Sequence, residues 1–535
     1  MKKLLLAICS LMMVFSVAGC GNRIMISDNA VIVAKEVDVT SLDTSIAFDG
    51  ISFEVIAAMI EGLYTVDKDG KVVPALTAEK SVSEDGKTHT FKLKDAMWSD
   101  GTFVTAHDFV FAWRRLADPK TASEYNYMLG SGVAEIENAD DVIAGNKQVE
   151  ELGVRAIDDK TLEVKLTKAV PFFDSLMTFP SFFPQKESFV KEKGDLYGLS
   201  PDHLLANGPF QLVSWEYGSK IILAKNTYYH DVDNVKTDNL IFKIIKNANT
   251  AVLDFEQGGN DFAKLNGELV DKYKGNENYK DILDGYLWYL SMNYQTPGLE
   301  NDSLRKAIAK VIDKQQIVDT ILKDGSVAAD YFVPKGLAIG PDGKDFRATT
   351  GTYMSYHVEE AKELWEKAKV ELGLETITFE LMYEEEGSVK NIAEFIKFQV
   401  ESHLPGISIK LVSLPKKIRL DRMRLQDYQI GITRWGPDYA DPTTYLNMLI
   451  EGANYNYGSY ESELYNQLMS DAMNTKDFSE RWTKLQEAEK VLLEDAAVIP
   501  LYQVGGATLI RSNIKGIENH LVGVPYIYKY VEKMK

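Results

Sequence analysis

The stretch Trp435-Gly-Pro-Asp-Tyr-Ala-Asp441 joins a strand-like segment, residues 428–434, to a helix-like segment, residues 443–450. Glycine and proline interrupt regular structure, so the backbone is predicted to turn here. Asp438 lies between two aromatic residues in this turn, and a loop carboxylate on a rigid scaffold is a typical group for binding something positive. The alternative is that Asp438 or Asp441 only caps the helix that follows.

The segments around this loop predict a mixed α/β fold. Residues 376–382 and 407–412 have the composition of strands, and helical spacing lies between them at residues 388–403. This order predicts a β-α-β unit with parallel strands. Apolar strands at residues 286–293 and 498–502 are predicted to carry the chain from one lobe to another. Further amphipathic helices are predicted at residues 52–63, 302–325, 357–373 and 481–495.

Length and charge narrow the class of protein. The chain has 535 residues, whereas a single hydrophobic core stops growing at about 250–300 residues. Two or three lobes are therefore expected. The formal net charge of −20 disfavours nucleic acid as a partner. An apolar content of 45% is typical of a packed globular protein.

The amino end has the pattern of an export signal. Met1-Lys-Lys precedes an apolar run, residues 4–17, that is too short to span a bilayer as a helix. The sequence Val17-Ala-Gly-Cys20 resembles a bacterial lipoprotein cleavage box, which predicts removal of residues 1–19 and a diacylglycerol group on Cys20. Two or more acyl chains anchor a protein stably to a membrane. The alternative is an ordinary secretory peptide with an incidental cysteine.

The sequence lacks the short motifs that mark common catalytic and cofactor sites. It contains no His-Glu-x-x-His, no Gly-x-Ser-x-Gly, no Gly-x-Gly-x-x-Gly and no complete phosphate-binding loop. None of the seven histidines has a partner at metal-binding spacing. We therefore predict no catalytic residue, no cofactor and no metal site. The acidic run from Glu384 to Glu386 is interpreted as a solvated turn.

Three stretches carry a resemblance to a known family: Asp85 to Leu116, Asn207 to Trp215, and the Trp435–Asp441 loop. They resemble the family 5 extracellular solute-binding proteins, which include the oligopeptide-binding proteins of ABC peptide importers. The resemblance implies an α/β fold of the periplasmic-binding-protein type II kind, with two large lobes, a hinge and a third smaller lobe. The implied lobes are residues 20–61, 188–288 and 506–535 for lobe I, 62–187 for lobe II, and 289–505 for lobe III.

The same resemblance implies a peptide site. The carboxylate of Asp438 matches the one that pairs with the peptide's ammonium end in this family. Backbone groups on two facing lobes would flank the peptide as neighbouring strands, and aromatic side chains would line pockets for its side chains. For Trp435 the alternative is an ordinary core position. The residues so assigned are Arg434, Trp435, Gly436, Asp438 and Tyr439, then Asp49, Gly50 and Ile51, and Tyr125 or Tyr127 from the second lobe.

One departure from the family pattern concerns the far end of the ligand. Some members hold the peptide's carboxylate with arginines, and here Met423 and Ile432 stand at the matching positions. These apolar residues favour longer or more hydrophobic peptides, as in the enterococcal peptide-pheromone-binding lipoproteins. The implied partners are an oligopeptide, the permease subunits of an ABC importer and, through Cys20, the outer face of the cell membrane, with the protein a monomer. Alternatives are a dipeptide, nickel, haem or sugar cargo, an exported hydrolase, or a sensor without a transport partner.

Overall fold

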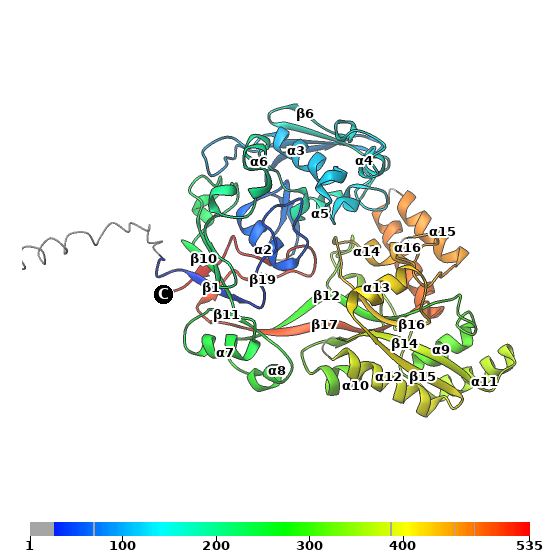
Figure 1. Cartoon of the computed structure of the whole chain (residues 1–535). Helices are drawn as coiled ribbons and strands as arrows, with labels where there is room; N and C mark the ends of the chain where they lie inside the picture. Colours follow the sequence, from blue (N-terminus) through cyan, green and yellow to red (C-terminus); the bar gives the residue numbers. More distant parts are fainter. Residues whose placement is uncertain (1–25, 68–69, 386–387, 454, 476) are drawn as a thin grey trace, which may run out of the picture.

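The computed structural model describes residues 26–67, 70–385, 388–453, 455–475 and 477–535 (Figure 1). The predicted lipidation site, Cys20, lies outside these residues. Within the part of the chain that is described, no helix is both long enough and apolar enough to cross a membrane.

One long mixed sheet is the frame of the molecule. Its centre is an antiparallel pair, β12 (Tyr279–Met292) and β17 (Val498–Ile510), and Figure 1 shows both strands running between the two halves of the molecule. The predicted crossings at residues 286–293 and 498–502 are therefore confirmed, and both strands are longer than predicted. The strand order is β15-β14-β16-β12-β17-β11-β1-β10-β9-β8. The outer strands are β14 (Ile377–Glu384), β15 (Ile407–Leu414) and β16 (Ile430–Trp435) on one side, and β1 (Val31–Lys35), β8 (Phe210–Glu216), β9 (Lys220–Lys225), β10 (Asn239–Ile244) and β11 (Phe262–Leu265) on the other.

The pairing of the two crossing strands is interrupted at their middle. The register of β12 against β17 shifts between Leu283 and Leu287, where Gly285 lies. A Cβ on Gly285 would lie 2.3 Å from the carbonyl oxygen of Leu521 and 2.6 Å from Pro437. Only glycine fits this position, since both neighbours approach the backbone directly. A register shift of this kind bends the strands of a sheet, so β12 and β17 are expected to bend near Gly285.

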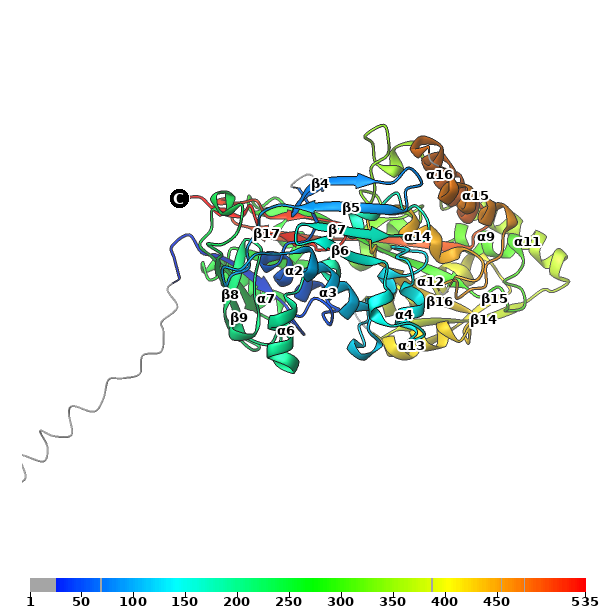
Figure 2. The same ribbon diagram turned by 90° about the horizontal axis from the view of Figure 1, so that it is seen from above.

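The apolar side chains form two large cores, one on each side of the crossing. The first core includes residues of a separate four-stranded sheet, whose strands lie side by side in Figure 2. The second core is built from residues between 287 and 502.

Elements of the first half include α2 (Gly50–Met59), α3 (Ala106–Ala117), α4 (Ala139–Ile143), α5 (Phe173–Leu176) and the sheet β4-β5-β7-β6 (Thr77–Val82, Thr88–Leu93, Thr161–Lys165, Val154–Asp158). The second half contains α9 (Asp302–Lys310), α11 (Val358–Leu372), α12 (Val389–His403), α13 (Lys416–Arg424), α15 (Glu463–Asn474) and α16 (Phe478–Glu494).

The predicted β-α-β unit is confirmed. Strands β14 and β15 pair in parallel from Ile377–Ile407 to Glu384–Leu414, with α12 between them in the chain. The single helix predicted at residues 302–325 is wrong, because the chain forms α9, α10 (Lys314–Gln316) and a π-helical turn in succession. Asp313 explains the break: its side chain accepts a hydrogen bond from the backbone N–H of Gln316 and so starts a new helix.

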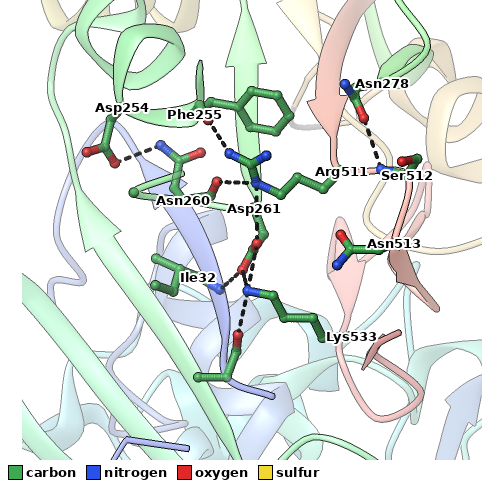
Figure 3. Close-up of polar contacts among 12 residues, drawn as sticks. Ile32, Asp254, Phe255, Asn260, Asp261, Asn278, Arg511, Ser512, Asn513 and Lys533 are labelled. Atoms are coloured by element: carbon green, nitrogen blue, oxygen red, sulfur yellow. Dashed lines mark hydrogen bonds and ion pairs between the residues drawn. The ribbon is translucent and has the colours of Figure 1, made fainter. Parts of the chain in front are cut away.

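The carboxyl-terminal segment is fastened to the first half by a buried carboxylate (Figure 3). Asp261 accepts a hydrogen bond from the backbone N–H of Ile32 at 2.9 Å, and its oxygens lie 3.0 Å from Lys533 Nζ and 3.5 Å from Arg511 Nε. Its side chain is 3% exposed. These contacts join β1, the start of β11 and the end of the chain, so that the chain returns to the half in which it began.

Candidate ligand-binding site

The loop after β16 is held rigidly at its second aspartate. Asp441 forms two 2.8 Å contacts with the guanidinium of Arg481 on α16, and the Arg481 side chain is 1% exposed. Asp441 also accepts hydrogen bonds from the backbone N–H and the hydroxyl of Thr443, the first residue of α14 (Thr443–Leu446). The cap position of α14 is Pro442, so Asp441 is not the helix cap; it binds the first helical residue from one position earlier and fixes the loop to the second core through Arg481.

Asp438 is placed differently. Its backbone N–H donates to Thr444 Oγ1 at 3.0 Å, and the Tyr127 hydroxyl, which belongs to the other half of the molecule, lies near enough to its carboxylate to affect the pKa. Burial raises the pKa of Asp438 to about 7, and the nearby Tyr127 hydroxyl only partly offsets this rise. No described cation lies close enough to lower that pKa. The loop thus presents a half-buried, desolvated carboxylate that lacks a positive partner among the described residues.

This carboxylate lines a cavity of about 730 Å³ between the two halves. Asn447 Nδ2 donates to the Gly132 carbonyl at 3.4 Å and so joins the two walls, and outside the cavity the Ala440 N–H donates to Ser175 Oγ of the other half at 3.1 Å. A concave site of this volume, with few polar groups, is the usual form of a small-ligand pocket. The lining comes from residues 126–144 and 168 on one side and residues 435–455 and 473 on the other.

The aromatic residues of the loop have separate roles. The ring of Trp435 lines the cavity and packs against Tyr455, with ring centroids 4.6 Å apart. Tyr439 borders the same cavity, but its ring is buried and stacks on Phe172 of the first half at 4.4 Å. Tyr439 therefore mainly joins the loop to the first core, whereas Trp435 offers an aromatic wall to a ligand.

Gly436 is explained by a neighbour within the protein. A Cβ at this position would lie 2.4 Å from the ring of Tyr286 on β12. The close approach expected for this glycine is thus made by Tyr286, and its part in binding a ligand stays a prediction.

The side chain of Arg434 is used inside the protein. Its guanidinium donates to Glu384 at 3.1 Å and lies 4.8 Å from the ring centroid of Trp288. Glu384 also accepts from the buried Arg419 at 3.2 Å and is itself fully buried. The interpretation of Glu384 as part of a solvated turn is wrong, because two arginines distant in sequence converge on its carboxylate. Residues 386 and 387 lie outside the described residues.

One edge of β16 is open beside the cavity. The strand pairs with β12 from Ile430 to Trp435, but with β14 only at Ile430 and Gly431. Among the described residues, no strand pairs with the β14-facing edge of β16 beyond Gly431. An unpaired edge next to a cleft is where an extended chain can add as a further strand. The predicted role of the Arg434–Gly436 backbone depends on this edge.

The facing segment differs from its prediction. Gly50 and Ile51 form the first turn of α2, not an extended edge, because Asp49 caps the helix by accepting from the Ser52 N–H at 2.8 Å. Asp49 Oδ2 also accepts from the hydroxyls of Thr40 and Ser52. A Cβ on Gly50 would meet nothing within 4 Å, so open space adjoins this residue. Residues 49–51 therefore face a ligand, if at all, as the amino end of a helix.

Tyr125 and Tyr127 were alternatives for the second lobe, and the structure separates them. The ring of Tyr125 packs between Phe53 and Phe179, at 5.3 and 5.1 Å between centroids. Tyr127 lines the cavity, and its hydroxyl lies near the carboxylate of Asp438. The sequence indicates Tyr127 only weakly, since the signal is a pair of aromatic residues in the second predicted lobe.

Comparison with known proteins decides the family. Residues 71–457 match the bacterial extracellular solute-binding proteins, family 5. The chain belongs to this family. The dipeptide-binding protein of Lactococcus lactis subsp. cremoris is 34% identical over 514 residues, or 92% of each chain. Two solved structures align over 95% of this chain: Listeria monocytogenes OppA bound to peptide, with 35% identity, a TM-score of 0.75 and 99% of that chain covered, and the pheromone receptor PrgZ, with 33%, 0.76 and 100%.

In this family 5 protein the two positions that depart from the family pattern are buried. Met423 is fully buried and packs with Met382 and Tyr428, and Ile432 is fully buried in the second core. The neighbouring Arg422 pairs with Asp427, and Arg424 pairs with Asp421. Met423 and Ile432, which the sequence predicts to stand where some members carry arginines, are thus buried apolar side chains.

Ligand affinity in this family 5 protein is expected to fall as the pH falls below 7. A cationic ligand group prefers ionised Asp438, whose pKa burial raises to about 7, so binding at lower pH must expel a proton. Affinity should therefore decrease by about tenfold for each pH unit well below the pKa. Isothermal titration calorimetry of a free peptide between pH 5 and 7, in two buffers of different ionisation enthalpy, measures both the affinity and the proton release.

The folding stability of the ligand-free protein should change with pH in the opposite direction to the ligand affinity: Asp438 should contribute more stability at low pH than at high pH. The pKa of Asp438 lies above its unfolded value, so the folded state binds more protons between about pH 4 and 7. The contribution of this group to stability is complete below pH 4 and is lost as the pH rises through 7. The Asp438→Asn variant is the control and should lack both dependences. Wild-type affinity that stays constant from pH 5 to 7 would contradict the assignment.

Proposed function

We propose that this protein is a lipid-anchored extracellular receptor that captures extended oligopeptides and delivers them to an ABC importer. Family 5 consists of solute-binding proteins. Relatives that span nearly the whole chain are named as dipeptide- or oligopeptide-binding proteins. The observation that carries the proposal is the half-buried carboxylate of Asp438, which lines a cavity and lacks a positive partner among the described residues.

The ligand's main chain would add to the open edge of β16. A peptide in strand conformation offers N–H and C=O groups that are the same for every sequence, so this mode gives affinity without selecting side chains. The ammonium end would meet Asp438, which lies just beyond the end of the strand. A charge-assisted hydrogen bond of this kind contributes about 1.5–3 kcal/mol. In this proposal, backbone contacts bind any peptide sequence, and Asp438 adds a specific contact to the ammonium end.

Capture would involve closure about the crossing strands. The proposed lobes are residues 20–61 with 188–288 and 506–535, residues 62–187, and residues 289–505. Two separate cores and the interrupted pairing at Gly285 support a hinge between the first and the third of these lobes. A ligand shifts such an equilibrium only through its preference for the closed form. Contacts to both sides of the cavity supply that preference.

The length of the bound peptide depends on how the site holds the peptide's carboxylate end. Buried Met423 and Ile432 replace the arginines that hold a peptide's carboxylate in some members, which favours longer peptides, including a hydrophobic pheromone. The likeness to the pheromone receptor PrgZ supports the same branch. The L. lactis relative, named for dipeptides, supports the shorter cargo. The export pattern ending at Cys20 supports attachment to the outer face of the membrane, and the lack of catalytic motifs supports binding without chemistry.

Blocking the ligand's amino end tests the proposal. An N-acetylated peptide is expected to bind about 100-fold or more weakly than the same peptide with a free amino end, because Asp438 then stays buried without a positive partner. Isothermal titration calorimetry at pH 7.5 measures the ratio. The matched control is the peptide amidated at its carboxyl end, which should bind as the free peptide does. Equal affinities for the acetylated and free peptides would exclude Asp438 as the ammonium partner.

A further inference from the structure

We propose that the 730 Å³ cavity beside Asp438 receives the side chain of the ligand's first residue, and that it selects for positive charge while tolerating different sizes. This inference depends on the proposed function, since it takes the ligand to be a peptide with its ammonium end at Asp438. It goes further in naming a substrate class: peptides that begin with lysine or arginine.

The position of the cavity follows from the connectivity of an amino acid. The ammonium group and the side chain of the first residue share one carbon atom. Asp438 and Trp435 both line the cavity, and the open edge of β16 leads up to them. A peptide that lies on that edge with its ammonium at Asp438 therefore brings its first side chain to the cavity.

The walls suit a long side chain with an apolar stem. Methionine side chains adapt to ligands of different shape, and two of them line this cavity. The volume of about 730 Å³ lies within the range for whole small ligands, so one amino-acid side chain does not fill it. Size should therefore discriminate little at the first position. The apolar lining consists of Val133, Ile143, Ala144, Met448, Ile450, Ala453 and Met473, with the rings of Tyr127, Trp435 and Tyr455.

The charges of the lining are predominantly negative. Besides Asp438, the carboxylates of Asp140 and Glu451 line the cavity, and their hydrogen-bond partners are neutral: Ser131 for Asp140, Asn466 for Glu451. Among the described residues no cation forms an ion pair with either. The one lysine of the lining, Lys168, is paired with Glu135 at 2.8 Å. Concave surfaces lined by one sign of charge concentrate ligands of the opposite sign.

Lysine and arginine combine the two properties that the cavity offers. Their aliphatic stems pack along apolar surface while the charged end stays at the solvated rim. Asp140 and Glu451 are exposed, so each contributes only modestly to the affinity for a cation. Their sum, with repulsion of a like charge, should separate lysine from glutamate at the first position by about tenfold.

The test is a set of pentapeptides that differ only at the first residue: Lys, Leu, Phe, Gly or Glu. Calorimetry at pH 7.5 and low salt should place Lys about tenfold above Glu, with Leu and Phe between them and within about threefold of each other. In the Asp140→Asn/Glu451→Gln double variant the ratio of Lys to Glu should shrink to about twofold. The matched control is Asp141→Asn: Asp141 follows Asp140 on α4, pairs with Lys147 and is not part of the lining. This variant should keep the full ratio.

A second peptide set separates the cavity from the net charge of the protein. Lysine moved from the first to the third position should lose the gain in affinity, and an equal gain there would overturn the inference. Equal affinities for Lys and Glu at the first position, or a double variant that keeps the full ratio, would overturn it as well. If none of the free peptides binds, the proposed function fails instead.

Discussion

Replacing Asp438 with asparagine is expected to weaken the binding of a free peptide by about 100-fold or more and to abolish the distinction between free and N-acetylated peptides. Asparagine keeps the size of the side chain and one oxygen acceptor, so the variant removes mainly the negative charge. The ligand's ammonium would then be buried without a counter-charge. Calorimetry with both peptides on wild type and variant forms a complete double-mutant cycle.

The control for this prediction is another carboxylate of the same region. Asp427 precedes β16, its side chain is 70% exposed, and it pairs with Arg422 at the surface. Asp427→Asn should therefore leave both affinities within about twofold of wild type. Asp438→Asn that still binds the free peptide as tightly as wild type would refute the role assigned to this residue.

The second large effect is a loss of folding stability, expected when Asp441, which holds the loop through its ion pair with Arg481, is replaced. Asp441→Ala leaves Arg481 buried without its partner, and breaking such a pair from one side costs about 3–5 kcal/mol. Urea unfolding monitored by tryptophan fluorescence should register this loss, with Trp482 beside Arg481 as a local reporter. The loop that carries Asp438 should also lose its fixed position, so peptide affinity should fall in the same variant.

Removal of both partners discriminates a structural pair from a general loss of packing. The Asp441→Ala/Arg481→Met double variant should recover much of the stability, because no uncompensated charge remains buried. Asp421→Ala is the surface control: Asp421 pairs with Lys417, whose side chain is 84% exposed, and its loss should change the free energy of unfolding by about 1 kcal/mol or less. An effect of Asp441→Ala no larger than this control would contradict the prediction.

The sequence predicted well those features that depend on neighbours in the chain. The turn at Trp435–Asp441, the β-α-β unit of β14, α12 and β15, and the capped helix α11 all follow from periodicity and from turn and cap residues within a few positions. The helix predicted at residues 302–325 is too long, because Asp313 is a local capping signal that starts a new helix. The predicted start of α2 at residue 52 is too late for the same reason: Asp49 is a helix cap, whereas the prediction places it in a loop.

What the sequence by itself determined is the loop and its carboxylate: glycine and proline force a turn, and Asp438 lies in it. The tertiary structure alone decided the chemistry of that carboxylate, since its partial burial, the nearby hydroxyl of Tyr127 and its raised pKa arise where the two halves of the chain meet. The same holds for Glu384, which two arginines from different elements convert from an expected surface residue into a buried one. Charge and desolvation depend on everything that surrounds a group in space, whereas a turn depends only on the residues beside it.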